Sequence, residues 1–150
     1  MEKLRLIVAG DSPPFLQKLV SLLVVEFDAV ATATDGKTAL GLIRRCEPDL
    51  VVLDMQMPGL NGIEITGELA KNPFSPPVVI CSAEGEPEII EAERETGAAE
   101  YAFKARIETD LRLAAKSAVQ DGPLATVAAK RGFDLSEAVS LRQISSLPPR

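Results

Sequence analysis

Short apolar runs alternate along the chain with segments in which apolar residues recur every three or four positions. The short runs predict strands, and the helical spacing predicts amphipathic helices. The predicted strands span residues 4–10, 29–34, 50–54, 78–83 and 101–104. The predicted helices span about residues 13–26, 35–46, 63–71, 86–97 and 107–119. Five strand–helix units in regular alternation favour an α/β fold, a doubly wound parallel sheet with helices on both faces.

Four polar side chains stand at the carboxyl ends of these predicted strands. They are Asp11, Asp54, Ser82 and Lys104. Open parallel sheets bind ligands outside the carboxyl ends of their strands, so these residues are the candidates for a site. The stretch DLVVLDMQMPGLNG, residues 49–62, is the most informative. A carboxylate at the end of a buried strand is costly unless another group pairs with it.

Composition narrows the class of protein without identifying a site. The 150 residues are 46% apolar and 25% charged, which suits one domain with a short appendage. A net charge of -6 argues against a general nucleic-acid or anionic-membrane surface. No segment is apolar enough to span a bilayer, and MEKLRLIVAG lacks a signal-peptide cleavage region. Because Cys46 and Cys81 also lack metal-ligand or redox spacing, we expect a reduced, cytoplasmic chain.

The chain contains no histidine. This excludes histidine-dependent catalytic triads, histidine-ligated metals and any phosphohistidine carried by the chain itself. If the function needs histidine chemistry, a partner must supply it.

Four motifs, in order, resemble the receiver domains of two-component response regulators. They are LIVAGDSPPF at the first strand, PDLVVLDMQMPGLNGIE around Asp54, VVICSAE at the fourth strand and GAAEYAFK at the fifth. The resemblance assigns residues 1–119 to a receiver domain and leaves 120–150 as a helical or flexible appendage. It implies a flavodoxin-like, three-layer fold with sheet order 2-1-3-4-5.

The same resemblance implies phosphoryl transfer. Asp54 would accept a phosphoryl group from a sensor histidine kinase or phosphotransfer protein and form an acyl phosphate. Mg²⁺ would bind Asp11, Asp54 and the backbone carbonyl of Gln56, because it prefers oxygen ligands and offsets the repulsion between two carboxylates. Lys104 would place its positive charge on the phosphoryl oxygens.

The resemblance also implies how phosphorylation changes the surface. The phosphoryl oxygens would attract the Ser82 hydroxyl, and Tyr101 would then turn inward. The small Ala83 would leave the site open to its donor. The altered face would be that of the fourth helix, fifth strand and fifth helix. It would engage a downstream protein target, and a homodimer could form through it.

Two positions depart from the family pattern. Gly10 stands where the family usually has the first of two adjacent acids, and such an outer-shell group typically contributes ~10–100-fold to metal affinity. We therefore expect weakened Mg²⁺ binding rather than none. Ala105 follows Lys104 where proline is common, and we give this change little weight. Gly10 also supports an alternative, a phosphorylation-independent receiver that acts as an interaction module.

Each site residue also has a plain structural interpretation. Asp54 could form an Asx turn, Asp11 could cap the following helix, and Lys104 could be a solvated lysine at a strand end. Ser82 could bond a neighbouring backbone group, and Tyr101 could be a core or edge aromatic. Their occurrence at successive strand ends favours a shared site.

Other chemistries fit the sequence poorly. AGDSPP has one glycine where a dinucleotide-binding loop needs three, and Ser82 does not lie in a nucleophile elbow. A phosphatase of the haloacid dehalogenase kind needs a second aspartate where this chain has Gln56. We therefore expect no conventional enzyme, and at most catalysis of the chain's own phosphorylation and dephosphorylation.

Residues 120–150 lie outside the resemblance. LATVAAKRG and DLSEAVSLRQI are plausible short helices, and they bury little core by themselves. We expect a flexible or docking appendage. The front of a longer DNA-binding transcriptional regulator is the alternative, although the basic footprint of a helix-turn-helix is not visible.

Overall fold

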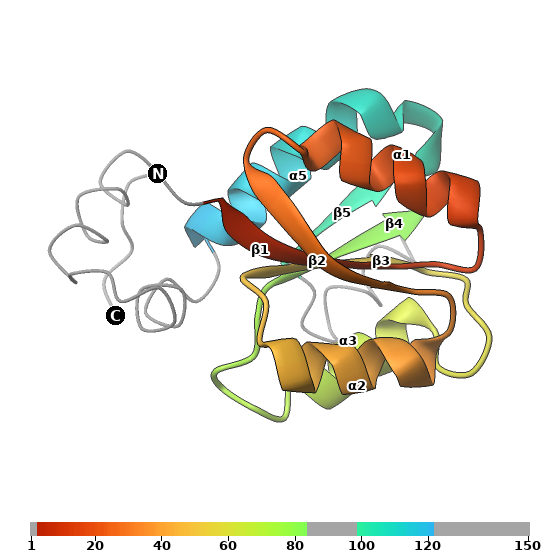
Figure 1. Ribbon diagram of the computed structural model, residues 1–150, viewed down its shortest axis with the longest axis vertical. Helices are drawn as coiled ribbons and strands as arrows, with labels where there is room; N and C mark the ends of the chain where they lie inside the picture. Colours follow the sequence, from red (N-terminus) through yellow and green to blue (C-terminus); the bar gives the residue numbers. More distant parts are fainter. Residues whose placement is uncertain (1–2, 84–98, 122–150) are drawn as a thin grey trace, which may run out of the picture.

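The computed structural model describes residues 3–83 and 99–121, which form a five-stranded parallel sheet between two layers of helices (Figure 1). The strand order β2-β1-β3-β4-β5 confirms the predicted doubly wound topology. The strands are β1 (Leu4–Ala9), β2 (Phe27–Ala33), β3 (Leu50–Asp54), β4 (Val78–Ser82) and β5 (Glu100–Phe103). The helices are α1 (Pro13–Leu23), α2 (Gly36–Cys46), α3 (Gly62–Leu69), the short 3-10 helix η1 (Lys104–Arg106) and α5 (Ile107–Asp121).

The helices divide between the two faces of the sheet (Figure 1). Helices α1 and α5 cover one face of the sheet, and α2 and α3 cover the other. Successive side chains of a strand point to opposite faces, so each strand contributes to both cores. The α1/α5 core includes Leu6, Val8, Leu19, Leu50, Val52, Leu111 and Ala115. The α2/α3 core includes Ile7, Ala39, Ile43, Val51, Leu53, Ile65 and Ile80. Strand β3 is buried along its whole length, as its unbroken apolar run predicts.

Strand β2 lies at one edge of the sheet and contains one extra residue. Its pairing with β1 passes from Ala29 directly to Ala31, so Val30 forms a β-bulge. As a result, Ala29 packs against the α1/α5 core and Ala31 against the α2/α3 core, although both would face one side of a regular strand. The strand begins at Phe27, earlier than the predicted start at residue 29.

The remaining described elements lie within a few residues of their predicted positions. Helix α1 ends at Leu23, before the predicted end, and the following Val24 and Val25 are 50% and 74% exposed and so contribute little to the core. The predicted helix at 86–97 and residues 122–150 lie outside the described part of the chain. Among the described helices, none combines the length and hydropathy needed to cross a membrane.

Three helices begin at the carboxyl edge of the sheet with polar N-caps. Ser12 caps α1, Asp35 caps α2 and Asn61 caps α3, and each side chain accepts a backbone N–H from the first turn. Hydrogen bonds from the Thr38 backbone and hydroxyl hold the pKa of Asp35 below its ordinary value. Asn61 and Glu64 form a reciprocal capping box. These caps fix the loops around the end of β3.

Candidate functional site

The centre of the candidate site is Asp54, the last residue of β3. Strand β3 lies between β1 and β4, and Asp54 pairs in register with Cys81. The residue is only 1% exposed. Because side chains alternate along a strand, Asp54 points to the α1/α5 side of the sheet, as Val52 does. A carboxylate buried to this extent needs a partner.

Lys104 supplies that partner from the end of β5. Its Nζ lies 2.8 Å from Asp54 Oδ1, and the two side chains are 30% and 2% exposed respectively. Lys104 is therefore not the solvated strand-end lysine of the plain interpretation. Removing one partner of a fully buried ion pair typically costs ~3–5 kcal/mol, because the other charge is left uncompensated. The cost here is smaller, since Lys104 keeps partial contact with water.

The loop after β3 bonds the same carboxylate oxygen. The Gln56 backbone N–H donates to Asp54 Oδ1 over 3.1 Å, so the Asx bond of the plain interpretation exists alongside the ion pair. No residue in the described ranges donates a hydrogen bond to Asp54 Oδ2. Oδ2 is thus the oxygen available to a ligand.

Gly10 and Asp11 lie at the end of β1, next to β3. A Cβ atom built on Gly10 would lie 3.0 Å from Asp54 Cβ and 3.3 Å from Asp54 Oδ2. Glycine therefore allows a close approach that a side chain would disturb. Asp11 follows it and is exposed. The N-cap of α1 is Ser12, so the alternative in which Asp11 caps that helix is wrong.

The ends of β4 and β5 carry the remaining predicted residues. Ser82 is 3% exposed at the end of β4, and its register partner on β5 is Phe103. Ala83 comes next and is exposed. Tyr101 is half-buried on β5, with its ring centroid 5.5 Å from that of Phe103. The strand that carries Ser82 therefore lies between the two strands that supply the carboxylate and the ammonium.

The donor atoms around Asp54 suit Mg²⁺. The predicted ligands are the carboxylates of Asp11 and Asp54 and the backbone carbonyl of Gln56. The described ranges contain no group of three or more His, Cys, Asp or Glu side chains that could hold a metal. Mg²⁺ does not require one, because it uses one or two carboxylates and completes its shell with water and phosphate oxygens. Oδ2 of Asp54, to which no described residue donates a hydrogen bond, fits such a ligand set.

An aromatic ring completes the surroundings of Lys104. Lys104 Nζ lies 5.1 Å from the ring centroid of Phe15, in the first turn of α1. Phe15 was not among the site residues predicted from the sequence. The signal that could have identified it was its position shortly after Asp11, at the end of the helix that faces the site.

Close backbone contacts hold the loop between β3 and α3. The Gly36 N–H donates to the Pro58 carbonyl over 3.0 Å. A Cβ atom on Gly36 would lie 1.9 Å from the Leu60 carbonyl oxygen, closer than two non-bonded heavy atoms can approach. Gly59, between Pro58 and Leu60 in the sequence, has a φ of 82°, which glycine adopts without strain. The first turn of α2 thus contacts the loop that follows Asp54.

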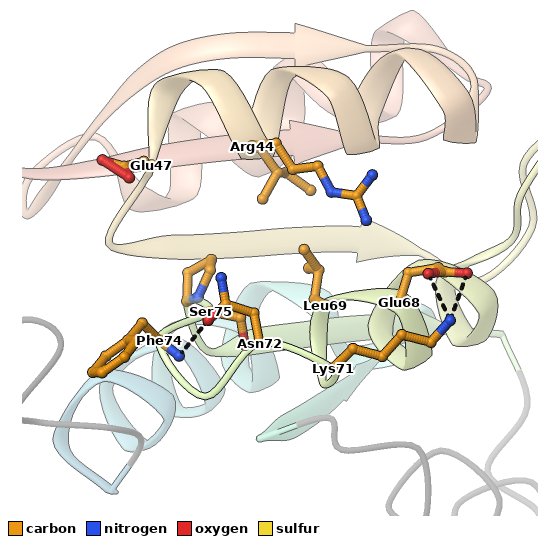
Figure 2. Close-up of a pocket in the computed structure, with 10 residues that line it drawn as sticks. Arg44, Glu47, Glu68, Leu69, Lys71, Asn72, Phe74 and Ser75 are labelled. Carbon is orange, nitrogen blue, oxygen red and sulfur yellow. Dashed lines mark hydrogen bonds and ion pairs between the residues drawn. The ribbon is translucent and has the colours of Figure 1, made fainter.

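A separate pocket of about 640 Å³ lies at the opposite, amino edge of the sheet (Figure 2). It is formed by the end of α2, the end of α3 and the loop that leads to β4. Its lining carries two basic residues, Arg44 and Lys71, and two acidic residues, Glu47 and Glu68, and Lys71 pairs with Glu68 over 3.1 Å. Its lining shares no residue with the surroundings of Asp54.

Comparison with known proteins points to one family. The family model for the response regulator receiver domain matches residues 6–116. The probable transcriptional regulatory protein NarL of Mycobacterium tuberculosis is 32% identical over 112 residues, which cover 73% of this chain and 52% of NarL. The transcriptional regulatory protein PdtaR of the same organism is 30% identical over 141 residues, which cover 93% of this chain and 68% of PdtaR. This chain thus spans about half the length of NarL.

Solved structures show the same fold. The signal receiver domain of NarL from Mycobacterium tuberculosis matches with a TM-score of 0.70 and 31% identity, over 76% of this chain and 98% of that chain. A chain of the CheX–CheY–BeF3–Mg complex from Borrelia burgdorferi matches with a TM-score of 0.71, over 76% of this chain and 87% of that chain. At 21% identity, the second match shows the fold alone.

Proposed function

The chain belongs to the response regulator receiver domain family, and on this premise we propose that Asp54 accepts a phosphoryl group from a histidine kinase or phosphotransfer protein. The observation that carries the proposal is the 2.8 Å contact between Lys104 Nζ and Asp54 Oδ1 at the carboxyl edge of the sheet. Receiver domains act in two-component signalling with histidine kinases. The absence of histidine from this chain fits a phosphohistidine donor on a separate protein.

The transfer requires a carboxylate oxygen of Asp54 to attack phosphorus. A bond forms between that oxygen and phosphorus, the bond from phosphorus to the imidazole nitrogen of the donor breaks, and the imidazole takes up a proton. Oδ2 is the oxygen that no described residue bonds, so it is the natural nucleophile. Lys104 would offset the charge that the phosphoryl oxygens bring. Catalysis would therefore consist of positioning and electrostatics.

Receiver domains generally bind Mg²⁺ for phosphorylation. In this chain, Asp11, Asp54 and the backbone carbonyl of Gln56 would hold the ion, which supplies positive charge to the phosphoryl oxygens when bound. Gly10 cannot provide the outer oxygen that an acid would give at this position. We therefore expect Mg²⁺ affinity to be ~10–100-fold below that of a site with the second acid.

The same residues would convert phosphorylation into a change of surface. The Ser82 hydroxyl would bond a phosphoryl oxygen, Tyr101 would turn into the space beside it, and Ala83 would leave the entrance open. The affected face would include β5 and α5, and would engage a downstream protein or a second copy of the chain. A histidine kinase partner and two free cysteines, Cys46 and Cys81, fit a cytoplasmic location.

Incubation with acetyl phosphate and Mg²⁺, followed by intact mass measurement, tests the proposal. We expect one phosphoryl adduct on the wild type and none on Asp54→Asn. Asp35→Asn is the matched control, because asparagine keeps the N-cap of α2 at the same edge of the sheet. This control should be phosphorylated like the wild type. An adduct on Asp54→Asn, or no adduct on the wild type at any Mg²⁺ concentration, would contradict the proposal.

A phosphorylation-independent interaction module is the second candidate, and Gly10 is the observation that favours it. The Lys104–Asp54 ion pair would then only stabilise the edge of the sheet. This candidate predicts no adduct on the wild type, and partner binding that Asp54→Asn leaves unchanged.

DNA binding is the third candidate, because NarL and PdtaR are named as transcriptional regulators and this chain spans about half of NarL. It predicts salt-dependent retention on duplex DNA that is lost when the chain is cut after Val119. Retention that persists in the truncated chain, or none in the full chain, would contradict it.

A further inference from the structure

The ammonium group of Lys104 has a second neighbour besides Asp54. Its Nζ lies 2.8 Å from Asp54 Oδ1 and 5.1 Å from the ring centroid of Phe15. An ammonium within about 6 Å of a ring centroid is attracted by the negative face of the aromatic ring. Lys104 is thus held between a carboxylate on β3 and an aromatic ring on α1.

The backbone that carries Phe15 is held rigidly. Ser12 caps α1 and its Oγ accepts the Phe15 N–H over 3.4 Å. Pro13 and Pro14 occupy the first two helical positions, where their fixed φ angles match the helix. The ring itself is half-buried against the α1/α5 core. Phe15 is therefore placed before any ligand arrives.

Lys104 lacks such restraint of its own. Its side chain is 30% exposed and sits at the end of a long, flexible aliphatic stem at the start of η1. A lysine in this position loses side-chain entropy when it stays at the carboxylate, and water competes for its charge. A second attractive surface on the protein raises the fraction of molecules in which the ammonium is in place.

We propose that Phe15 is a positioning residue whose ring face holds the Lys104 ammonium at Asp54, ready to meet an incoming phosphoryl group. The inference rests on the proposed function of Asp54. When phosphorylation removes the negative charge from the carboxylate, the ring continues to hold the ammonium close to the new phosphoryl oxygens. The ring thus acts on the reaction only through the lysine.

A role in core packing alone is the competing explanation, and ring electronics separate the two. Fluorination of the ring weakens its negative face while nearly preserving its shape. Phe15 should therefore be replaced, by site-specific incorporation, with phenylalanine carrying one, two or three fluorine atoms. We expect the rate of phosphorylation by acetyl phosphate to fall stepwise, by about 3–10-fold over the series, as a partly desolvated cation–π contact implies.

Three further proteins make the test specific. Phe15→Tyr keeps the ring and should stay close to the wild-type rate, whereas Phe15→Leu keeps apolar bulk without the ring and should match the trifluorinated protein. In the Lys104→Met background, the fluorine series should have no effect on the remaining slow rate. A flat series in the Lys104-containing protein, or an equal slope in Lys104→Met, would overturn the role of Phe15.

The contact can also be measured without phosphorylation. The Lys104 ε-methylene protons should show an upfield ring-current shift in NMR spectra that disappears in Phe15→Leu, and no such shift would overturn the inference. A wild-type protein that takes up no phosphoryl group would overturn the proposed function itself. If the wild type is phosphorylated and every fluorinated protein reacts at the same rate as the wild type, only the role of Phe15 is overturned.

Discussion

Replacing Gly36 with alanine should displace the loop that follows Asp54. A Cβ atom at Gly36 would lie 1.9 Å from the carbonyl oxygen of Leu60, 2.6 Å from its carbonyl carbon and 2.7 Å from its Cα. All three are backbone atoms, so no side-chain rotation can relieve the overlap. Either α2 must shift at its first residue or the loop must move away, and the Gly36 N–H to Pro58 carbonyl bond would be strained.

The magnitude follows from two opposing effects. Overpacking of this kind typically costs about 1–3 kcal/mol. Alanine in place of glycine favours a helix by up to about 1 kcal/mol in the interior, and by less at the first helical residue. We therefore expect Gly36→Ala to lower the free energy of unfolding by about 1–2 kcal/mol.

Gly41 provides a matched control within the same helix. It lies on α2, and a Cβ atom there would meet no heavy atom within 4 Å apart from the adjoining backbone of its own helix. Gly41→Ala should therefore raise the free energy of unfolding by about 0.5–1 kcal/mol. Urea denaturation with an unchanged m-value measures both effects. If both variants change the free energy of unfolding in the same direction, or if Gly36→Ala is as stable as the wild type, the argument from the close approach is refuted.

Three further predictions concern charged groups. A double-mutant cycle between Lys104→Met and Asp54→Asn should give a coupling of about 0.5–3 kcal/mol in urea denaturation, and additive effects would mean that the 2.8 Å ion pair contributes nothing. Asp11→Asn should raise the Mg²⁺ concentration for half-maximal phosphorylation more than about tenfold. It should change stability little, because Asp11 is exposed and caps no helix. An unchanged Mg²⁺ titration would remove Asp11 from the ligand set. The hydrogen bond from Lys18 holds the pKa of Glu108 below its ordinary 4.5, so the stabilisation by this pair is present above that pH and is lost as the pH falls through the lowered pKa. In Lys18→Met, an NMR titration should show the Glu108 pKa rising towards its ordinary value, and an unchanged pKa would exclude Lys18 as the cause.

The fold could be predicted from the sequence because burial leaves a clear pattern. Strand β3 is buried on both faces and appears as an unbroken apolar run, and α2 shows the spacing of a one-sided helix. Among the described strands, the bounds of β2 differ most from their prediction, because this strand lies at the edge of the sheet and alternate residues are exposed. Because exposure still alternates through Val30, periodicity alone cannot detect the bulge.

The candidate site could be predicted in part. Asp54 and Lys104 follow apolar runs, and parallel strands bring their carboxyl ends to one edge, so proximity follows from topology. The Phe15 ring and the Gly36–Leu60 contact could not be predicted in this way. Each joins residues from separate loops or helices, and their closeness depends on packing distances that no sequence pattern records.

The bulge at Val30 has a consequence for the start of α2. Strand β2 has seven residues against six in β1, so deleting Val30 would leave every other pair in place and keep Ala33 in the α2/α3 core. Asp35 and Gly36 lie two and three residues after Ala33 and would keep their positions at the edge of the sheet. A one-residue deletion on this outermost strand should therefore be absorbed by loss of the bulge, and the start of α2 should stay aligned with the loop that follows Asp54, two strands away.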